Sequence, residues 1–407
     1  MIPSEFRPSR PWGALEVPVY VPSEEGILGP LERIRVLEVG GIGPVPFCGM
    51  LLGDFGAEVI RIERVGGSAA SEVAPGGILG RNKKVIGVNL KDAGAAPVMN
   101  ALVGRADVLI EGFRPGVMER LGWSPEVCAR RNPRLIFGRM TGWGRDGPLA
   151  QSPGHDINYI STIGLLSTIG RRGEKPVPPL NLAGDYGGGG LLLALGICAA
   201  VYEREVSGKG QVVDAAMTDG AALLMNTVYE LMQRGEWSVE RESNLLDGGA
   251  HFYAAYETAD AQFISIAASE PQFYRRLLHE LGLESDSELL VEQMNRHKWA
   301  KFREQFAAVF RTKTRAAWDR QLLQKGVCYA PVLTFEEAQA FPHNRARGMF
   351  VKVGAFTQAA SAPRFGRTTL GEPVAAERLG THTADILGQA GLTAETVRQL
   401  LESGVVA

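Results

Sequence analysis

The sequence lacks the cysteine and histidine patterns that hold metals or disulfide frameworks. Its 407 residues contain four cysteines and six histidines, with no CxxC and no HExxH motif. Isolated cysteines of this kind are typical of free thiols in a reducing compartment. We therefore predict neither disulfides nor a metal site.

A strong charge imbalance and a long apolar stretch are also missing. The formal net charge of −2 and the isoelectric point of about 6.4 argue against binding to nucleic acid or to a membrane surface. The longest apolar run, residues 191–202, is too short to span a bilayer and predicts a buried helix. The N-terminal residues have no apolar core like that of a signal peptide. These absences predict a cytoplasmic protein without nucleic-acid or membrane partners.

The sequence does contain a regular alternation of strand and helix patterns. Such alternation predicts an open, mostly parallel α/β sheet with right-handed crossovers, whose ligands bind beyond the carboxyl ends of the strands. A long helix is expected over 187–205, and a strand over 211–217 leads into another helix over 218–234. The earlier strands are expected over residues 34–40, 57–63, 84–89, 106–110 and 134–140.

The chain changes character on both sides of this region. Residues 1–29 are rich in proline and predict an extended arm. After residue 250, two short strand patterns precede four helical patterns, which predicts a smaller α/β lobe. These strands are expected over 251–256 and 262–266, and the helices over 271–282, 286–295, 298–310 and 314–325.

The first strand–helix loop does not have a dinucleotide-binding sequence. Gly41 and Gly43 are followed by Pro44 and Pro46 where a GxGxxG motif needs its third glycine, so a tight turn is the better interpretation. Basic residues also follow the expected strands. They either form a solvated face or converge on a polyphosphate ligand; they are Arg61, Arg64, Arg81, Lys83, Lys84, Lys91 and Arg114.

Two residues in glycine-rich settings are candidates for acid/base chemistry. His155 follows Gly154 near the expected mouth of the sheet, and Asp185 precedes a run of four glycines and a helix. Asp185 is either a helix N-cap or an acid/base group beside free helix N–H groups that stabilise an oxyanion. Such a pair suits abstraction of a proton next to a carbonyl. Glu270 either complements the dipole of the helix that starts at Pro271 or orients His155.

Together these segments resemble the family III CoA-transferase superfamily and, within it, the α-methylacyl-CoA racemases. The resemblance spans roughly residues 31–370 and rests on the combination of motifs rather than on any one of them. The matching segments are 35–38, 43–50, 54–64, 81–84, 107–117, 154–159, 178–185, 208–217, 270–274 and 362–365.

The resemblance implies an interlocked homodimer that binds an acyl-CoA thioester. Each chain would have a Rossmann-like large domain, residues 30–225 and 341–407, and a small domain, residues 226–340. His155 and Asp185 would be the acid/base pair, with Glu270 paired to His155 and with Asp156 and Asn181 in support. Contacts with the CoA thioester would come from Arg64, Val88, Asn89, Leu90, Lys91, Arg114, Gly154, Asp156, Ile157, Asn158 and Tyr159.

The implied reaction is a 1,1-proton transfer that interconverts the two configurations of a 2-methylacyl-CoA in lipid metabolism. The thioester enolate would rest on N–H groups at the start of the Gly-rich helix. Neither a metal nor a redox cofactor is required, because the thioester acidifies the α-carbon. A CoA-transferase with Asp185 as the nucleophile is the alternative on the same fold. Transferases generally lack the histidine and have a glycine-rich loop in the small domain, to which residues 247–250 are weakly similar.

Overall fold

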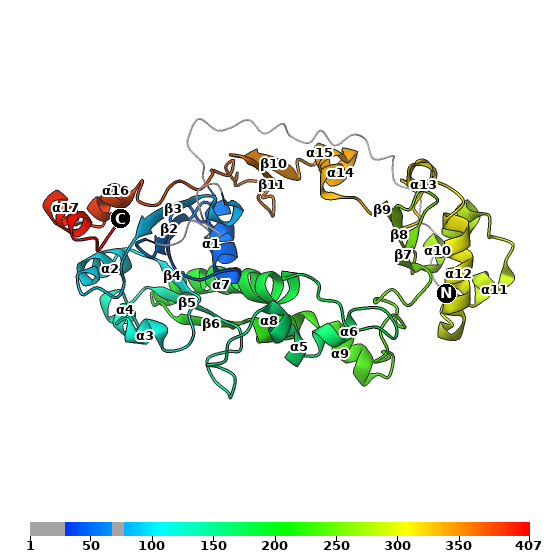
Figure 1. Ribbon diagram of the computed structural model, residues 1–407, viewed down its shortest axis with the longest axis horizontal. Helices are drawn as coiled ribbons and strands as arrows, with labels where there is room; N and C mark the ends of the chain where they lie inside the picture. Colours follow the sequence, from blue (N-terminus) through cyan, green and yellow to red (C-terminus); the bar gives the residue numbers. More distant parts are fainter. Residues whose placement is uncertain (1–28, 67–76) are drawn as a thin grey trace.

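The computed structural model describes residues 29–66 and 77–407, so nearly all of the arm predicted over 1–29 lies outside the described residues. The described chain forms two lobes (Figure 1). The larger lobe contains a six-stranded sheet, and the smaller lobe contains a three-stranded sheet. The larger lobe therefore has the predicted α/β architecture.

The large sheet is parallel throughout, with the strand order β3-β2-β1-β4-β5-β6. The order reverses between β1 and β4, and such a reversal leaves a crevice at the carboxyl ends of the two strands. The sequence predicted all six strands. Their bounds are β1 Arg35–Val39, β2 Glu58–Glu63, β3 Lys83–Gly87, β4 Val108–Glu111, β5 Ile136–Thr141 and β6 Val212–Ala216.

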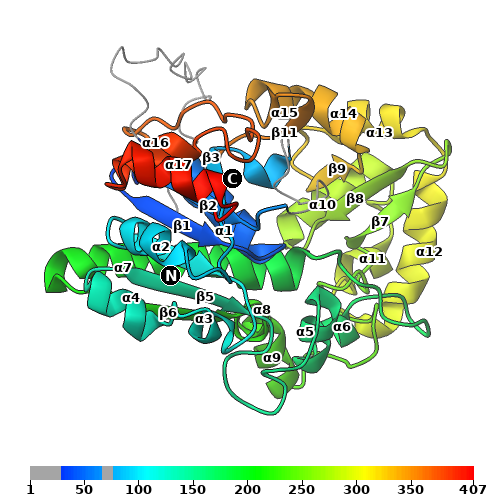
Figure 2. The ribbon, with the colours of Figure 1, turned by 60° about the vertical axis from the view of Figure 1, so that its left-hand side comes forward.

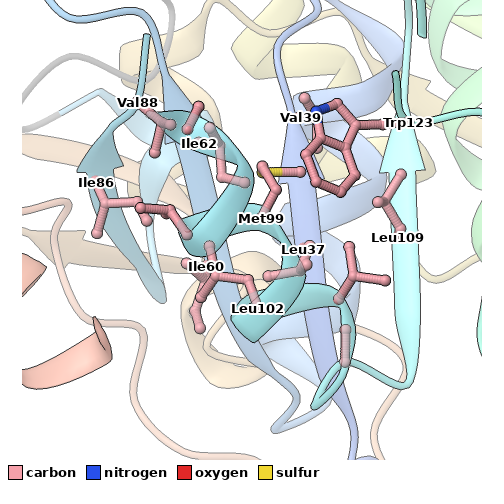
Figure 3. Close-up of a cluster of buried hydrophobic side chains, with 14 of the residues drawn as sticks. Leu37, Val39, Ile60, Ile62, Ile86, Val88, Met99, Leu102, Leu109 and Trp123 are labelled. Carbon is pink, nitrogen blue, oxygen red and sulfur yellow. The ribbon is translucent and has the colours of Figure 1, made fainter. Parts of the chain in front are cut away.

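Helices cover both faces of this sheet. One face packs against α1 (Pro44–Asp54) and α7 (Leu192–Ser207), and the other against α2 (Ala95–Val103) and α4 (Pro125–Arg131). Figure 3 shows the second face, where Met99 and Leu102 of α2 lie over β-strand side chains. The labelled residues around them include Leu37, Val39, Ile60, Ile62, Ile86 and Leu109 of the strands and Val88, which directly follows β3.

The C-terminal segment belongs to the same core. Helices α16 (Thr383–Gln389) and α17 (Ala394–Glu402) lie beside β3 (Figure 2), and their apolar residues join the cluster around α2. Val406 forms an antiparallel bridge with Val88. Both ends of the described chain therefore build the larger lobe, while the domain boundaries at 225/226 and 340/341 stay a prediction.

The helix that contains the four glycines begins five residues earlier than the predicted helix over 187–205. A π-helix, η2 (Leu182–Leu191), runs directly into α7, and the combined helix Leu182–Ser207 is long and apolar enough by length and composition to span a membrane. The predicted helix was therefore too short. In this fold the helix packs on the sheet, and a Cβ at Gly188 would lie 2.4 Å from Ala221 N of α8 (Met217–Leu224). Only glycine permits that approach.

The smaller lobe has its own aromatic core around an antiparallel sheet. The strands β7 (Tyr253–Glu257) and β8 (Phe263–Ala267) were predicted, whereas β9 (Tyr329–Pro331) was not. The four predicted helices are present with shorter bounds for the second and fourth. They are α10 Pro271–Leu281, α11 Ser287–Val291, α12 Trp299–Phe310 and α13 Arg315–Leu322.

Short elements connect the two lobes and complete the chain. The return from the smaller lobe carries two helices and a β-hairpin (Figure 1). These and the remaining elements are η1 Ile78–Gly80, α3 Val117–Arg120, α5 Asp156–Thr162, α6 Leu165–Thr168, α9 Asn226–Gln233, η3 Arg296–Lys298, α14 Phe335–Ala340, α15 Pro342–Ala346, β10 Phe350–Val353 and β11 Phe356–Ala359.

His251 makes the stability of the smaller lobe depend on pH. Its ring is fully buried, its Nε2 lies 2.7 Å from Tyr274 Oη, and burial, then the nearby Arg303, lower its pKa to about 3. An unfolded histidine has a pKa of about 6.5, so its contribution to stability is complete above that pH. As the pH falls toward 3, we expect the free energy of unfolding to fall by about 1.4 kcal/mol per pH unit.

The measurement is urea denaturation between pH 7 and 4. His251→Phe should flatten the dependence of the unfolding free energy on pH, whatever it does to stability at pH 7. The same substitution at the exposed His297 should leave the slope unchanged. Equal slopes in wild type and His251→Phe would contradict this account of the histidine.

Candidate active site

A cavity of about 400 Å³ lies where the strand order reverses, at the carboxyl ends of β1, β4 and β5. Its walls are residues 42–45 after β1, residues 112–115 after β4 and residues 140–143 at the end of β5. The sequence analysis placed a ligand site at this edge, and the cavity is where that rule puts it. The remaining lining residues are Ala150, Ser152, Gly154, His155, Tyr159, Asp185 and Met217.

His155 reaches the cavity from the N-terminus of α5. It is the N-cap residue, with an extended backbone, and its main-chain N–H donates to Asn158 Oδ1 at 3.1 Å. Asn158 therefore fixes the backbone of the histidine rather than its ring. The imidazole is exposed and is part of the cavity lining.

Asp185 reaches the same cavity from inside a helix. It lies in the first turn of η2, whose N-cap is Asn181, so of the two interpretations of Asp185 the N-cap is wrong. Asn181 Nδ2 donates to Asp185 Oδ2 at 3.2 Å, which agrees with the supporting place expected for Asn181. The structure thus brings His155 and Asp185, thirty residues apart in sequence, to one cavity.

Asp156 joins the two segments that carry these residues. Its buried Oδ2 accepts hydrogen bonds from the N–H groups of Gly184 and Asp185, both at 2.7 Å. A carboxylate at the first turn of a helix is also favoured by the helix dipole. These two N–H groups already donate to Asp156. The prediction that the N–H groups at the start of the Gly-rich helix stabilise the enolate is therefore wrong for Gly184 and Asp185.

Tyr159 lines the same cavity as His155. Its hydroxyl donates to Gly154 O, and its ring meets Trp143 edge to face at 4.8 Å. Burial, followed by the negative charge of Asp185, raises the pKa of Tyr159. The hydroxyl therefore stays protonated near neutral pH and acts as a hydrogen-bond donor.

Two of the basic residues expected at this edge face cavities. Arg114 lines the cavity just described, and Lys91 lines a second cavity of about 680 Å³ together with Leu90. Arg120 and Val117 of α3 lie in the wall of this second cavity. The sequence analysis missed Arg120, although its position in a basic helix end just after the β4 loop was a usable signal.

Most of the predicted basic residues do not line either cavity. Arg61, Arg81 and Lys83 are buried in ion pairs within the large lobe, and Lys84 pairs with Glu58. A polyphosphate site made from this whole set was therefore a wrong prediction. Successive residues of a strand point to opposite faces of the sheet rather than to its carboxyl-terminal edge. The side chains of Arg61 and Lys83 therefore lie under the covering helices, where they pair with a buried carboxylate.

Other predicted contacts have varied surroundings. The side chain of Val88 is in the hydrophobic core and its N–H donates to Glu63 O, so it offers no side-chain contact at the surface. Arg64, Asn89 and Ile157 are at least partly exposed, and none of them lines either cavity.

Glu270 lies in the smaller lobe, away from the cavity lining. It is the N-cap residue of α10, its side chain makes no capping hydrogen bond, and it is exposed. Within the described residues of one chain, the structure does not bring Glu270 into the cavity with His155.

Comparison with known proteins identifies the family. The model of CoA-transferase family III matches residues 31–383. The chain belongs to CoA-transferase family III. Two family relatives are named α-methylacyl-CoA racemase. The one from Mus musculus is 43% identical over 378 residues, covering 92% of this chain and 97% of that protein. The one from Homo sapiens is 42% identical over 381 residues, with the same coverage.

A CoA-transferase of the family is less similar. The succinyl-CoA–D-citramalate CoA-transferase of Chloroflexus aurantiacus is 29% identical over 398 residues, covering 93% of this chain and 98% of that protein. Solved structures share the fold. A CaiB/BaiF family protein from Brucella suis has a TM-score of 0.77 at 24% identity, covering 89% of this chain and 99% of that chain.

The two hydrogen bonds that Asp156 accepts from η2 are expected to stabilise the fold, which a substitution can test. Asp156→Ala leaves the N–H groups of Gly184 and Asp185 without their acceptor, so we expect the free energy of unfolding to fall by about 2–3 kcal/mol. Urea denaturation measures this change. Ser161→Ala, which removes an exposed hydroxyl on the same helix, is the control and should change stability by less than about 0.5 kcal/mol. Equal decreases of the unfolding free energy in the two variants would show that these hydrogen bonds of Asp156 do not stabilise the fold.

Proposed function

We propose that this family III protein is an α-methylacyl-CoA racemase. It interconverts the (2R) and (2S) forms of 2-methylacyl-CoA thioesters by removing and returning the α-proton. The observation that carries this proposal is that His155 and Asp185, two groups able to exchange protons, line one cavity. The 42–43% identity to racemases, compared with 29% to a CoA-transferase, supports the same activity.

The reaction needs one base and one acid at the α-carbon. His155 takes the α-proton of one configuration, and the thioester carbonyl accommodates the electron pair as an enolate. Asp185 then returns a proton to the opposite face, and the reverse direction exchanges the two roles. A metal or redox cofactor is not required, because the thioester itself acidifies the α-carbon. Apolar side chains in the lining suit a branched acyl group; they are Ile42, Val45, Phe113, Met140, Trp143 and Met217.

The CoA moiety extends from this cavity to the second one. Residues 112–115 line the first cavity, and Val117 and Arg120, which follow directly, line the second. Lys91 and Arg120 supply two cations for phosphate groups, and Arg114 supplies a third at the first cavity. One loop between β4 and α3 thus connects the acyl and nucleotide ends of the substrate.

A CoA-transferase with Asp185 as its nucleophile is the alternative on this fold. The transferases of the family have a glycine-rich loop in the small domain. In this chain, the Asp247 carboxylate accepts the N–H groups of Asn244 and Gly249 and closes the loop 247–250 on itself. Arg303 holds the carbonyls of the same loop. Because these backbone groups are already hydrogen-bonded within the smaller lobe, the loop has few groups left to bind an acyl intermediate, which favours the racemase over the transferase.

The active unit is a homodimer that shares its sites. Large apolar side chains lie exposed along one face of the continuous helix formed by the end of η2 and α7, and an exposed apolar face of this length fits a second protein surface. They are Leu191, Leu195, Tyr202 and Val206, exposed by 55, 65, 77 and 79%. Because Glu270 lies outside the cavity lining of its own chain, its pairing with His155 is made across two copies.

The direct test is NMR of a 2-methylacyl-CoA incubated with the protein in D2O, with succinate present as an acceptor. We expect deuterium at C2, loss of optical purity and no CoA on succinate. His155→Ala and Asp185→Ala should each slow the exchange by at least about 100-fold, because each removes one proton-transfer group. His297→Ala, an exposed histidine outside this cavity, should exchange at the wild-type rate.

Two results would contradict the proposed racemase activity. Transfer of CoA to succinate without exchange at C2 would make Asp185 a nucleophile and the protein a transferase. If several 2-methylacyl-CoA substrates show neither exchange at C2 nor transfer of CoA, both the racemase and the transferase proposals are wrong.

Sharing of sites is tested by complementation. In a mixed dimer of His155→Ala and Glu270→Ala chains, one of the two sites has both residues intact. Co-expression should therefore restore about a quarter of the wild-type exchange rate, since half of random pairs are mixed. A mixture of His155→Ala and Asp185→Ala chains, both altered in the same cavity, should restore nothing. No gain in the first mixture, or full activity of Glu270→Ala alone, would place the site within one chain.

A further inference from the structure

Three charged side chains are buried together beneath the cavity. Glu38 of β1, Arg61 of β2 and Lys83 of β3 lie on the sheet face that α1 covers, with side-chain exposures of 0, 3 and 0%. Glu38 Oε1 accepts from Arg61, and its Oε2 lies 2.7 Å from Lys83 Nζ. One carboxylate thus serves two cations.

Arg61 also donates from Nε to Glu63 Oε1 at 2.8 Å, and both cations bond to carbonyls of the chain that enters α1. Arg61 donates from Nη1 to Gly40 O at 3.0 Å and from Nη2 to Gly41 O at 3.1 Å. Lys83 Nζ donates to Pro46 O at 2.8 Å. The segment 40–46 is therefore held at both ends from within the sheet.

The residues between these two anchors face Asp185. Residues 42–45 line the cavity, and a Cβ added at Gly43 would lie 3.0 Å from Asp185 Oδ2. Pro44 also lies against η2, because a Cβ at Gly190 would be 2.5 Å from Pro44 O. A shift of this segment would therefore change the space around the Asp185 carboxylate.

We propose that Arg61, anchored on Glu38 together with Lys83, is a positioning residue that holds segment 40–46 against Asp185 for proton transfer. The inference rests on the proposed function. Buried ion pairs stabilise a fold no better than well-packed apolar residues, so stability alone gives little reason for three buried charges here. Directional hydrogen bonds to three carbonyls give a fixed geometry that apolar side chains cannot provide.

The sequence offers a matched control in Arg81. This side chain is also buried and pairs with a buried carboxylate, Asp54, but at the far end of α1. Its other donors go to Gln358 Oε1 at 2.8 Å and Ala359 O at 2.7 Å, outside the cavity lining. Arg61→Lys and Arg81→Lys each keep the charge and remove the planar fork.

The measurement is kcat and KM for α-proton exchange in both variants, together with their unfolding free energies. We expect Arg61→Lys to lower kcat on the order of 10- to 100-fold with KM within about threefold of wild type, because misplaced acid/base groups slow the chemical step. Arg81→Lys should lose stability to a similar extent while kcat stays within about threefold. Equal falls of kcat in the two variants, an effect on KM alone, or an unchanged kcat in Arg61→Lys would overturn the proposal.

A second pair of variants serves if Arg61→Lys does not fold. Lys83→Met releases Pro46 O and leaves Glu38 paired with Arg61, whereas Lys84→Met alters the neighbouring, 40% exposed lysine. Lower kcat in Lys83→Met than in Lys84→Met supports the proposal, and equal kcat values contradict it. Exchange by the wild type is the separate test of the proposed function: its absence contradicts the racemase, whereas the two variant pairs test how Arg61 and Lys83 hold segment 40–46.

Discussion

The hydrogen bonds of one carboxylate hold the candidate site together. Asp156 follows His155 directly, and its Oδ2 accepts the N–H groups of Gly184 and Asp185. The start of α5 and the start of η2 are therefore fixed to each other at the point where each presents a reactive side chain. Apolar packing of Tyr159 and Ile160 holds the rest of α5, and the hydrogen bonds of Asp156 fix its first turn relative to Asp185.

Buried charges support the same region from below. Arg61 and Lys83 hold the segment after β1, and on the opposite face Glu111 accepts Phe113 N–H while pairing with Arg139. Burial raises the pKa of Glu111, and its bonds to Phe113 and Arg139 act in the opposite direction. The loops at the reversal of strand order thus have partners inside the sheet, which limits their movement where the cavity forms.

Much of the fold followed from periodicity, and the misses have physical reasons. All six strands of the large sheet were predicted because short segments rich in Val, Ile and Leu alternate with helical patterns along the chain. Residues 182–186 at the start of η2 were missed because they follow the prolines at 178 and 179 and show no helical pattern, and the glycines that follow let the helix pack closely on α1 and α8. β9 was missed because three residues containing a proline give no strand pattern, and β8 supplies its pairing.

The sequence by itself determined the alternation of elements, the edge that binds a ligand and the candidates His155, Asp185 and Arg114, because local patterns and motifs carry that information. Only the tertiary structure decided which basic residues line a cavity, since Arg61, Arg81 and Lys83 turn inward to buried carboxylates. It also separated Glu270 from the cavity of its own chain. Burial and pairing depend on residues distant in sequence, and no local pattern records them.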